Sequence, residues 1–573
     1  MDLKGNRAHS SPWRSVAPRR WWRRAAARPT LLVIAASVVG AALAAAVLFG
    51  ARWTPSGGDG TWVSAGVRVV LNAVSDSGQQ GAAARPLATV PDPSDRLLGG
   101  LLSPDLDDRS CLSRYGVAAY RRPSMHPLSS HLVSALRRYE SLHRLCGPGT
   151  PAYSRAVQRL RAPTTNGSDP SSEECSYLVW TPTAGLGNQI LSLTSAFLYA
   201  LLTDRTLLLH RGGDDLDDVF CEPFPGSTWL LPTNNNDDAS FPIRDMKRLT
   251  IGAPESLGSV LGRHDGSSSS AQQQQQPWMY VHLRHDYKAH DRLFFCDDVQ
   301  AGLLRRVPWL VTMADNYFAP GLFLVPRFEA QLARMFPRRD AVFHHLGRYL
   351  FHPSNTVWGM VTRYHGSYFA RAHERVGVQV RMFKWAPISV DELYAQILSC
   401  VHRENILPLP GISTAANTTT RWRNKAVVFA SLYSDFSDRL RDLYGGDDKE
   451  EVVSVFQPSH LGAQHFGDRV QNQKAFAEMT LLSFADVAVT TAASTFGYVS
   501  QGLAGRRPWV LARPDHGKAP PPGAACRMAP TVEPCFHSPP NYDCRANARG
   551  DSGKTVRYIR HCDDFPQGVQ LVE

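Results

Sequence analysis

The sequence predicts an α/β fold built from strand–turn–helix units. Glu174–Thr181 (ECSYLVWT) is an apolar run of strand length, and Gln189–Leu202 follows it as a predicted helix. A second apolar run, Thr206–His210, completes a strand–helix–strand rhythm that is typical of doubly wound sheets. Between the first strand and the helix, Gly185 and Gly187 permit a tight turn with a close approach of the backbone.

A second unit near the C-terminus repeats this pattern. Asp486–Thr491 reads as a short buried strand, Ser494 and Thr495 are N-cap candidates, and Phe496–Leu503 continues as a helix. Free N–H groups and the positive end of the helix dipole meet at such a turn, so it favours a phosphate. In α/β folds ligands bind at the carboxyl ends of strands, where this turn lies. On the pattern alone, an ordinary strand–helix connection is the alternative interpretation.

The first 51 residues predict a membrane anchor. Residues 1–28 carry most of the net charge of +11, and residues 30–51 contain no charged side chain, which is enough to span a membrane as a helix. The basic groups precede the span, so the positive-inside rule places the N-terminus in the cytosol. A cleaved signal peptide is the alternative interpretation. The rest of the chain is nearly neutral, so nucleic acid is not an expected partner.

The region beyond the anchor predicts a stem followed by an oxidised body. Residues 52–108 are rich in Gly, Ser, Pro and Asp, as in a flexible stem. All ten cysteines lie beyond the anchor, which favours disulfides in an oxidising compartment, although their pairing stays open. Four of them lie in Cys526–Cys562, where crosslinks would support a weak core. The sequons at Asn166 and Asn417 fit luminal exposure.

Several long stretches of this chain resemble one family, the plant galactoside 2-α-L-fucosyltransferases, which include the xyloglucan fucosyltransferases. The likeness runs from about Cys111 to the C-terminus and is far more specific than a single glycine motif. The stretches that carry it are TAGLGNQILSLTSAFLYALLTDRTLLL, FCEPFPGSTWLLP, HDYKAHDRLFFCDD, PWLVTMADNYFAPGLFLVP, FHHLGRYLFHPSNTVWG, VGVQVRMF, NQKAFAEMTLLSFADVAVTTAASTFGYVSQGL and EPCFHSPPNYDC.

The resemblance implies two Rossmann-like domains that face a cleft, a variant of the two-domain GT-B glycosyltransferase fold, behind an N-terminal transmembrane helix. We expect the domain boundary near Tyr368–Glu374, just before the VGVQVRMF strand. The expected segments are a cytosolic basic tail at 1–29, an anchor at 30–51, a stem at 52–108, an acceptor-side domain at 109–372, a GDP-fucose-binding domain at 373–530 and a disulfide-rich extension at 531–573.

The donor site that the resemblance implies lies in the second domain. Arg381, near the end of the VGVQVRMF strand, is the expected stabiliser of the GDP leaving group, because an arginine can clamp a diphosphate bidentately. On the pattern alone Arg381 would be a surface residue at a sheet edge. The turn residues Ser494, Thr495, Phe496 and Gly497 would complete the phosphate and nucleoside site. Further expected wall residues of this pocket are Gln457 and His460.

An inverting glycosyl transfer needs a base for the acceptor hydroxyl. Asp315 is the first candidate, because the motif context places it ahead of Tyr317 and Phe318, aromatic residues that we expect to stack on sugar rings together with Trp309. Asp564 is a second carboxylate that would orient donor or acceptor, and Asp286 with His285 is a third option. For any single aspartate, a cap or a solvated surface group is the alternative interpretation.

Three departures from the family pattern lie near the expected cleft. Gln189 stands where the family has arginine, Leu461 where an acidic residue is commoner, and Ala493 where a tryptophan often precedes STFGY. They put the acceptor in question more than the donor. Two other functions therefore stay open, namely a protein O-fucosyltransferase and a non-catalytic, membrane-anchored glycan-binding or scaffold protein.

The expected activity is transfer of L-fucose from GDP-fucose to a galactose-terminated glycan, such as a xyloglucan-like polysaccharide or an arabinogalactan, in α-1,2 linkage with inversion. The expected location is the Golgi membrane, with a single-pass type II topology and a luminal catalytic body. No cofactor is expected besides this donor. A metal is not expected either, because no acidic pair lies at an apolar strand end suited to Mg²⁺. The oligomeric state is not predicted.

Overall fold

A computed structural model describes the body of the chain. The described residues are 94–161, 175–211, 216–232, 241–264, 276–410, 424–445, 453–515, 517–540, 544 and 550–573. The predicted tail, the anchor, both sequons and the stem up to residue 93 lie outside them. Residues 87–573 form one compact unit, and all that follows concerns its described part.

The first sheet has four parallel strands in the order β2-β1-β4-β3. Its strands are β1 (Ser176–Thr181), β2 (Arg205–Leu209), β3 (Trp278–Leu283) and β4 (Trp309–Ala314). Apart from the first residue of β1 and of β3, every strand residue is buried. This matches near-continuous apolar runs such as YLVW, because helices cover both faces of a parallel sheet.

The second sheet has six strands in the order β10-β9-β8-β5-β6-β7, all parallel except β10, which is antiparallel to β9. The strands are β5 (Glu374–Val380), β6 (Lys425–Ser431), β7 (Val453–Phe456), β8 (Val487–Thr491), β9 (Trp509–Leu511) and β10 (Cys526–Met528); β11 (Ile559–His561) and β12 (Val569–Leu571) form a separate antiparallel pair. The predicted α/β fold with parallel sheets is confirmed. The first sheet ends with β4, and the second begins with β5.

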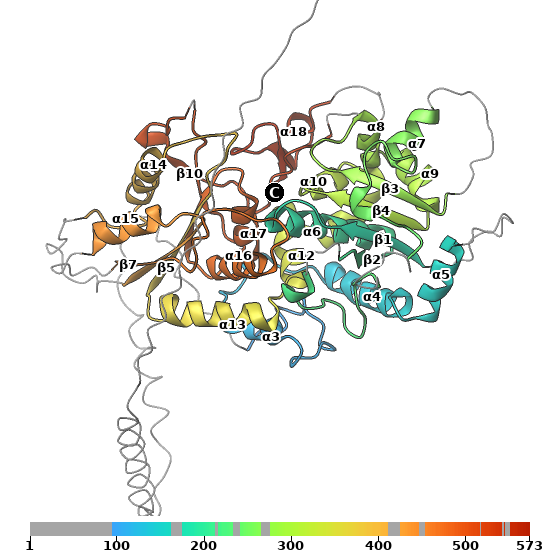
Figure 1. The fold of residues 1–573 in the computed structure, drawn as a ribbon, viewed down its shortest axis with the longest axis horizontal. Helices are drawn as coiled ribbons and strands as arrows, with labels where there is room; N and C mark the ends of the chain where they lie inside the picture. Colours follow the sequence, from blue (N-terminus) through green and yellow to red (C-terminus); the bar gives the residue numbers. More distant parts are fainter. Residues whose placement is uncertain are drawn as a thin grey trace, which may run out of the picture. The chain divides into compact units, whose positions relative to one another are not determined.

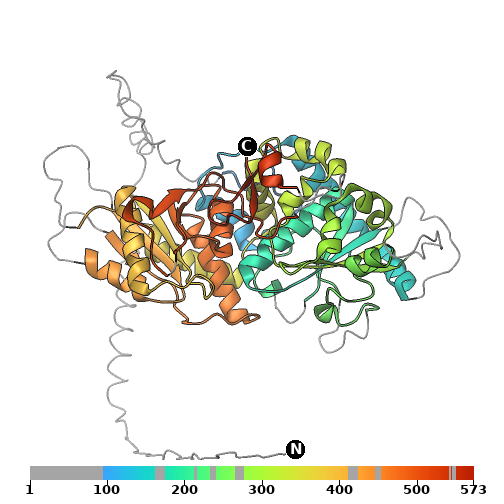
Figure 2. The ribbon, with the colours of Figure 1, turned by 90° about the horizontal axis from the view of Figure 1, so that it is seen from above.

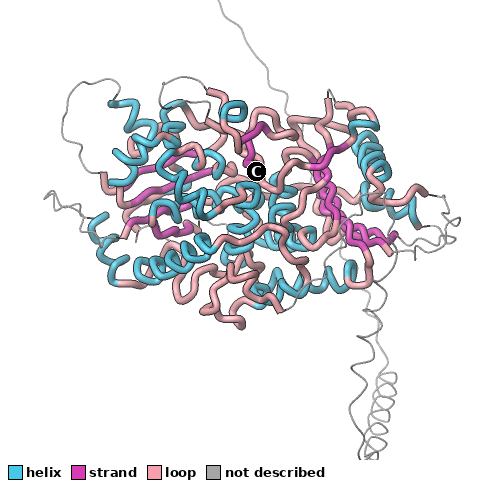
Figure 3. Tube along the Cα trace, turned by 180° about the vertical axis from the view of Figure 1, so that it is seen from behind, coloured by secondary structure: helices cyan, strands magenta, loops and turns pink. Residues whose placement is uncertain are grey.

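Helices flank both sheets (Figures 1 and 3). The α-helices are α3 (Leu112–Gly116), α4 (Ser130–Cys146), α5 (Pro151–Arg161), α6 (Leu186–Thr203), α7 (Leu257–His264), α8 (Ala289–Arg292), α9 (Asp297–Gly302), α10 (Ala319–Leu322), α11 (Pro326–Met335), α12 (Val342–Leu350), α13 (Asn355–Tyr364), α14 (Val390–Arg403), α15 (Asp435–Tyr444), α16 (Arg469–Leu482), α17 (Thr495–Ala504) and α18 (Ser552–Thr555). Between the sheets, α6 and α17 contact each other, and α12 and α16 each contact both of them (Figures 1 and 2).

Helix α6 begins three residues earlier than predicted. Gly185 is its N-cap, so Gly187 and Asn188 lie in the first turn of the helix rather than in a loop before it. The helix is apolar on nearly all sides and almost wholly buried, as expected for a helix in the centre of a large core. Within the described residues it is the one helix long and apolar enough to cross a membrane, and its burial identifies it as a core helix.

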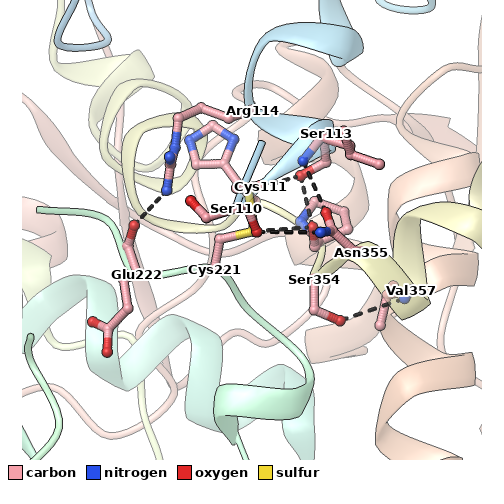
Figure 4. The surroundings of a disulfide bond; sticks show 12 residues. Ser110, Cys111, Ser113, Arg114, Cys221, Glu222, Ser354, Asn355 and Val357 are labelled. Carbon is pink, nitrogen blue, oxygen red and sulfur yellow. Dashed lines mark hydrogen bonds between the residues drawn. A yellow bond between two sulfur atoms is a disulfide. The ribbon is translucent and has the colours of Figure 1, made fainter. Parts of the chain in front are cut away.

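Disulfides tie distant segments together. The ten cysteines form the pairs Cys111–Cys221, Cys146–Cys175, Cys296–Cys544, Cys400–Cys526 and Cys535–Cys562. Two of the four cysteines in the C-terminal tail therefore pair outside it, which fastens the tail to both sheet regions. Figure 4 shows Cys111–Cys221, beside which the Ser113 hydroxyl donates to the Pro353 carbonyl at 2.6 Å. The disulfide joins the N-terminal part of the body to the segment around Cys221, and the Ser113 bond joins it to the segment that precedes α13.

The predicted stem extends too far into the body. Leu98, Leu101 and Leu102 are buried in the main hydrophobic core, and the Arg137 side chain donates to the Leu101 carbonyl at 2.9 Å. Residues 94–108 are thus packed, and the predicted boundary at 109 is too late. The reason is that a few apolar side chains in a polar, turn-rich segment suffice to dock it, which composition averages conceal.

Candidate active site

One cleft of about 880 Å³ opens between the two sheet regions. The first region contributes the turn between β1 and α6 and the residues after β3 and β4. The second contributes the ends of β5 and β6, helix α16, and the turn between β8 and α17. These are carboxyl ends of parallel strands on both sides, where α/β folds bind their ligands.

Helices α6 and α17 contact each other (Figure 1), and the strand–helix turns that lead into them both line the cleft. Each has an alanine in the left-handed backbone region, Ala184 with a φ of 62° and Ala493 with a φ of 59°. A Cβ on Gly187 would lie 2.7 Å from the hydroxyl oxygen of Thr495, and that hydroxyl donates to the Asn188 side-chain oxygen at 3.0 Å. Glycine at 187 therefore lets the two helix N-termini touch, as the predicted close approach required.

Arg381 is the first residue after β5 and lines the cleft. Its backbone N–H donates to the Thr491 hydroxyl at 3.0 Å, which fixes it to the end of β8. Its guanidinium is half-buried, and one nitrogen donates to the Gln464 side-chain oxygen at 2.7 Å. Burial lowers the pKa of Arg381 from its usual value. Strand β5 lies at the centre of the sheet, which excludes the sheet-edge interpretation of this arginine.

The α17 turn is built as a helix N-terminus should be. The Ser494 hydroxyl accepts from the Gly497 N–H and caps the helix. Ser494, Thr495 and Phe496 line the cleft, whereas Gly497 lies behind them. A Cβ on Gly497 would lie 3.0 Å from Thr490, so a glycine allows α17 to sit close to β8.

Asp315 lies at the end of β4 and is 7% exposed. The backbone N–H of His285 donates to one carboxylate oxygen at 2.9 Å, and Asn316 donates to the same oxygen at 2.6 Å. The other oxygen is hydrogen-bonded to Nδ1 of His285, whose side chain is largely exposed in the cleft. The carboxylate predicted as the base is therefore buried, and the exposed His285 ring lies between it and the open part of the cleft. Asp286 instead pairs with His282.

Asp564 supports the α17 turn from behind. Its carboxylate accepts the Ala493 N–H at 2.9 Å and the Tyr498 hydroxyl at 2.6 Å. It does not itself line the cleft, but the neighbouring His537 does, and burial lowers the pKa of His537 to about 4. In this structure Asp564 orients the turn that would hold a phosphate.

Gln457 and His460 do not line the cleft, although Ser459 between them does. The Gln457 amide donates to the carbonyls of Ser431, Tyr433 and Ser459 at 2.9–3.1 Å, so it holds the β6 and β7 loops together. The catalytic and donor-binding roles of all these predicted residues stay predictions; the structure brings Asp315, Arg381, Ser494, Thr495 and Phe496 to one cleft.

A buried carboxyl group on α16 lies on the second-region side of the cleft. Glu478 is 6% exposed and accepts a hydrogen bond from the Ser459 hydroxyl at 2.5 Å. Burial raises its pKa to about 8. The motif NQKAFAEMTLLS gives no sign that Glu478 is buried in the cleft, because a glutamate in a helical pattern is normally exposed to solvent.

The prediction that three aromatic residues stack on sugar rings is wrong. Tyr317, Phe318 and Trp309 are at most 2% exposed and belong to the core, where the Tyr317 hydroxyl donates to Glu533. The exposed aromatics of the cleft are Trp385 and Phe466. The sequence concealed this because Trp309 begins a buried central strand and Tyr317 and Phe318 follow it, and side chains on both sides of such a strand pack into the core.

The three departures from the family pattern occupy different positions. Gln189 is buried and donates to the Ala184 carbonyl at 3.1 Å, so it braces the β1–α6 turn. Leu461 is exposed and lines the cleft, and the buried Ala493 lines it too. The GLGN segment, which the resemblance placed at the cleft, does line it with Asn188, whereas sequence reasoning missed Gln464 and Glu478 as cleft residues.

Among the described residues, one cluster has the spacing of metal ligands, Cys535, Cys562 and Asp564. The two cysteines form a disulfide, so their sulfurs are not thiolate ligands. These residues therefore do not fit a metal site.

Most of this chain is similar to known fucosyltransferases. A family model described as xyloglucan fucosyltransferase matches residues 71–545. Galactoside 2-alpha-L-fucosyltransferase from Arabidopsis thaliana is 45% identical over 490 residues, which is 84% of this chain and 83% of that protein. The enzyme of the same name from Pisum sativum is 44% identical over 84% of this chain and 82% of its own length.

A solved structure agrees with these relatives. A mutant of Arabidopsis thaliana FUT1 in complex with GDP superimposes with a TM-score of 0.75 at 44% sequence identity, covering 83% of this chain and 100% of that chain. The family resemblance expected from the motifs is confirmed.

Proposed function

Because this chain belongs to the xyloglucan fucosyltransferase family, we propose that it transfers L-fucose from GDP-fucose to a terminal galactose of a glycan, in α-1,2 linkage and with inversion. One observation carries the proposal beyond family membership. An arginine and a helix N-terminus on one wall of the cleft oppose a histidine–aspartate pair on the other. The first wall suits a departing diphosphate, and the second suits a hydroxyl that must lose its proton.

The donor occupies the second-region wall in this proposal. The diphosphate lies between the Arg381 guanidinium and the first N–H groups of α17, which have no partner within the helix. To reach the phosphates, Arg381 exchanges its bond to Gln464 for bonds to phosphate oxygens, which are stronger because both partners are charged. Glu478 accepts N–H groups of the guanine base, and these hydrogen bonds favour its ionised form, which burial alone disfavours.

His285 is the proposed base, and Asp315 is its positioning partner. Asp315 accepts from Nδ1, which leaves Nε2 of His285 with a lone pair for the acceptor proton. As the acceptor oxygen forms its bond to the fucose anomeric carbon, the bond from that carbon to the GDP oxygen breaks and His285 takes the proton. Arg381 and α17 stabilise the negative charge that develops on the diphosphate. This scheme uses no metal.

The experiment that tests the function combines the full chain with GDP-fucose and a chelator. Separate samples contain galactosylated xyloglucan oligosaccharides, arabinogalactan oligosaccharides or a peptide acceptor, and fucose addition is followed by mass spectrometry. We expect addition to a galactosylated glycan. Addition to the peptide alone would overturn the glycan acceptor, and activity that requires added metal would overturn the metal-free scheme. A folded protein that binds GDP yet transfers to nothing would favour the non-catalytic alternative.

We also propose that the two sheets mark the two domains of a GT-B variant, and that residues 30–51 anchor the chain in the Golgi membrane with the body in the lumen. The asymmetric charge around the span supports this orientation. In intact microsomes the C-terminus should be protected from protease, and glycosidase treatment should increase its mobility on gels. A secreted chain whose N-terminus lies after residue 51 would contradict the anchor and support a cleaved signal peptide.

A further inference from the structure

Two arginines are buried away from the cleft without a counter-charge. Arg121 follows the short helix η1 (Val117–Ala119), and Arg348 lies on α12; each is 6% exposed. The Nε atom of each is buried and has no hydrogen-bond partner. Within the described ranges, neither arginine forms an ion pair with a carboxylate. The Arg121 guanidinium lies 5.9 Å from the Phe484 ring centroid, a contact that offsets only part of the cost of its burial.

The buried groups around these arginines add no negative charge. His344 donates from Nδ1 to the Gly502 carbonyl at 2.8 Å, so its Nε2 accepts from Arg348 at 3.1 Å as a neutral ring. Burial and neighbouring cations, Arg121 and Arg348 among them, lower the pKa of His352 well below its usual value. The carboxylate that acts on Arg348 is Asp95, which is exposed and accepts the Gly99 N–H at 2.7 Å.

Both arginines stay charged at neutral pH. Burial and repulsion from Arg348 lower the pKa of Arg121 to about 9, and burial lowers the pKa of Arg348 to about 10. Each value lies above 7, so two positive charges are held in the interior. An uncompensated buried charge costs several kcal/mol, which proteins offset with a partner of opposite charge.

We infer that a small inorganic anion, with the charge and size of chloride, binds beside Arg121 and Arg348. Neither arginine lines the large cleft, so a ligand bound in that cleft does not supply the missing negative charge. The site would also strengthen the junction between the two sheet regions. The segment that contains Arg121 reaches the second region through His126, whose ring bonds the Gly505 carbonyl at 3.1 Å, and through Arg122, which pairs with Asp486.

The test measures the melting temperature of the full chain while chloride replaces gluconate at constant ionic strength. We expect a saturating rise with chloride, because an anion that binds only the folded state stabilises it by mass action. Arg348→Met, which keeps an unbranched, apolar stem and removes the charged guanidinium, should abolish the rise. The control Arg439→Met, at an exposed arginine that pairs with Asp391, should keep it.

A second measurement decides the matter if Arg348→Met does not fold. Crystals of the unmodified chain grown in bromide should show an anomalous peak within hydrogen-bond distance of both guanidinium groups. No peak there, or a chloride response that is absent from the unmodified chain or equal in a folded Arg348→Met protein, would overturn the site.

Discussion

The β1–α6 and β8–α17 turns have nearly the same backbone and opposite chemistry. Each passes through an alanine with positive φ and enters a helix whose N-terminus faces the cleft. The α17 helix has a serine cap, Ser494, whereas the α6 helix begins at Gly185 without a side-chain cap. In the β8–α17 turn Asp564 accepts a hydrogen bond from the Ala493 N–H, whereas in the β1–α6 turn Gln189 donates one to the Ala184 carbonyl.

The difference separates the two tasks of the cleft. The capped turn has a polar, fixed N-terminus next to Arg381, which is the arrangement an anion needs. In the glycine-rich turn, Gly187 has no side chain and can therefore approach Thr495 closely. The Asn188 amide in the same turn donates to the backbone carbonyl of Asp315 at 2.8 Å. The α17 turn therefore suits the proposed donor, and the α6 turn joins that wall to the proposed base.

The largest expected effect is at the donor turn. Arg381→Ala should lower kcat by at least about 10³-fold, because it removes the charge that stabilises the departing diphosphate. The measurement is kcat with GDP-fucose, beside thermal melting to show that the protein remains folded. Arg439→Ala is the matched control on the surface. Full activity in Arg381→Ala would refute the assignment of the donor to this turn.

The opposite wall should respond in kcat and not in GDP affinity. His285→Gln should lower kcat by about 10²–10⁴-fold with an unchanged Kd for GDP, because only the proton acceptor is lost. Asp315→Asn should also lower kcat and change its pH profile, since it disturbs the ring orientation without removing the base. If His285→Gln keeps its kcat while Asp315→Asn loses it, the aspartate is the base, as the motif first suggested.

The sequence predicted the strands, turns and residues of this site better than the hydrogen bonds between those residues. Strand and helix periodicity located both turns, and the family motif located Arg381 and Asp315. It could not show that Asp315 bonds His285, or that Asp564 bonds the Ala493 N–H, because these pairs join residues that are 30 and 71 positions apart. The buried state of Tyr317 also depends on Glu533, far along the chain. Such contacts are decided by packing, which local patterns do not contain.

The contact between the turns can be broken without touching either chemical group. Gly187→Ala places a Cβ 2.7 Å from the Thr495 hydroxyl and 3.0 Å from its backbone, so the helix ends must move apart. We expect a loss of about 1–3 kcal/mol in the free energy of unfolding and a lower kcat. Gly359→Ala is the matched control, since it lies within α13 and a Cβ there would meet no atom within 4 Å. Equal stability changes in the two variants would show that the close approach is not needed.

The smallest expected effect concerns the positive φ of the alanine in each turn. Ala184→Gly and Ala493→Gly relieve a left-handed conformation that is unfavourable for alanine, so each should raise the free energy of unfolding by up to about 1 kcal/mol. Ala330→Gly, at an exposed site in the ordinary helix α11, should lower it by about the same amount. Chemical denaturation measures all three. Because Ala493 faces the donor wall, a gain in stability together with a fall in kcat for Ala493→Gly alone would mean that the donor turn needs rigidity and the joining turn does not.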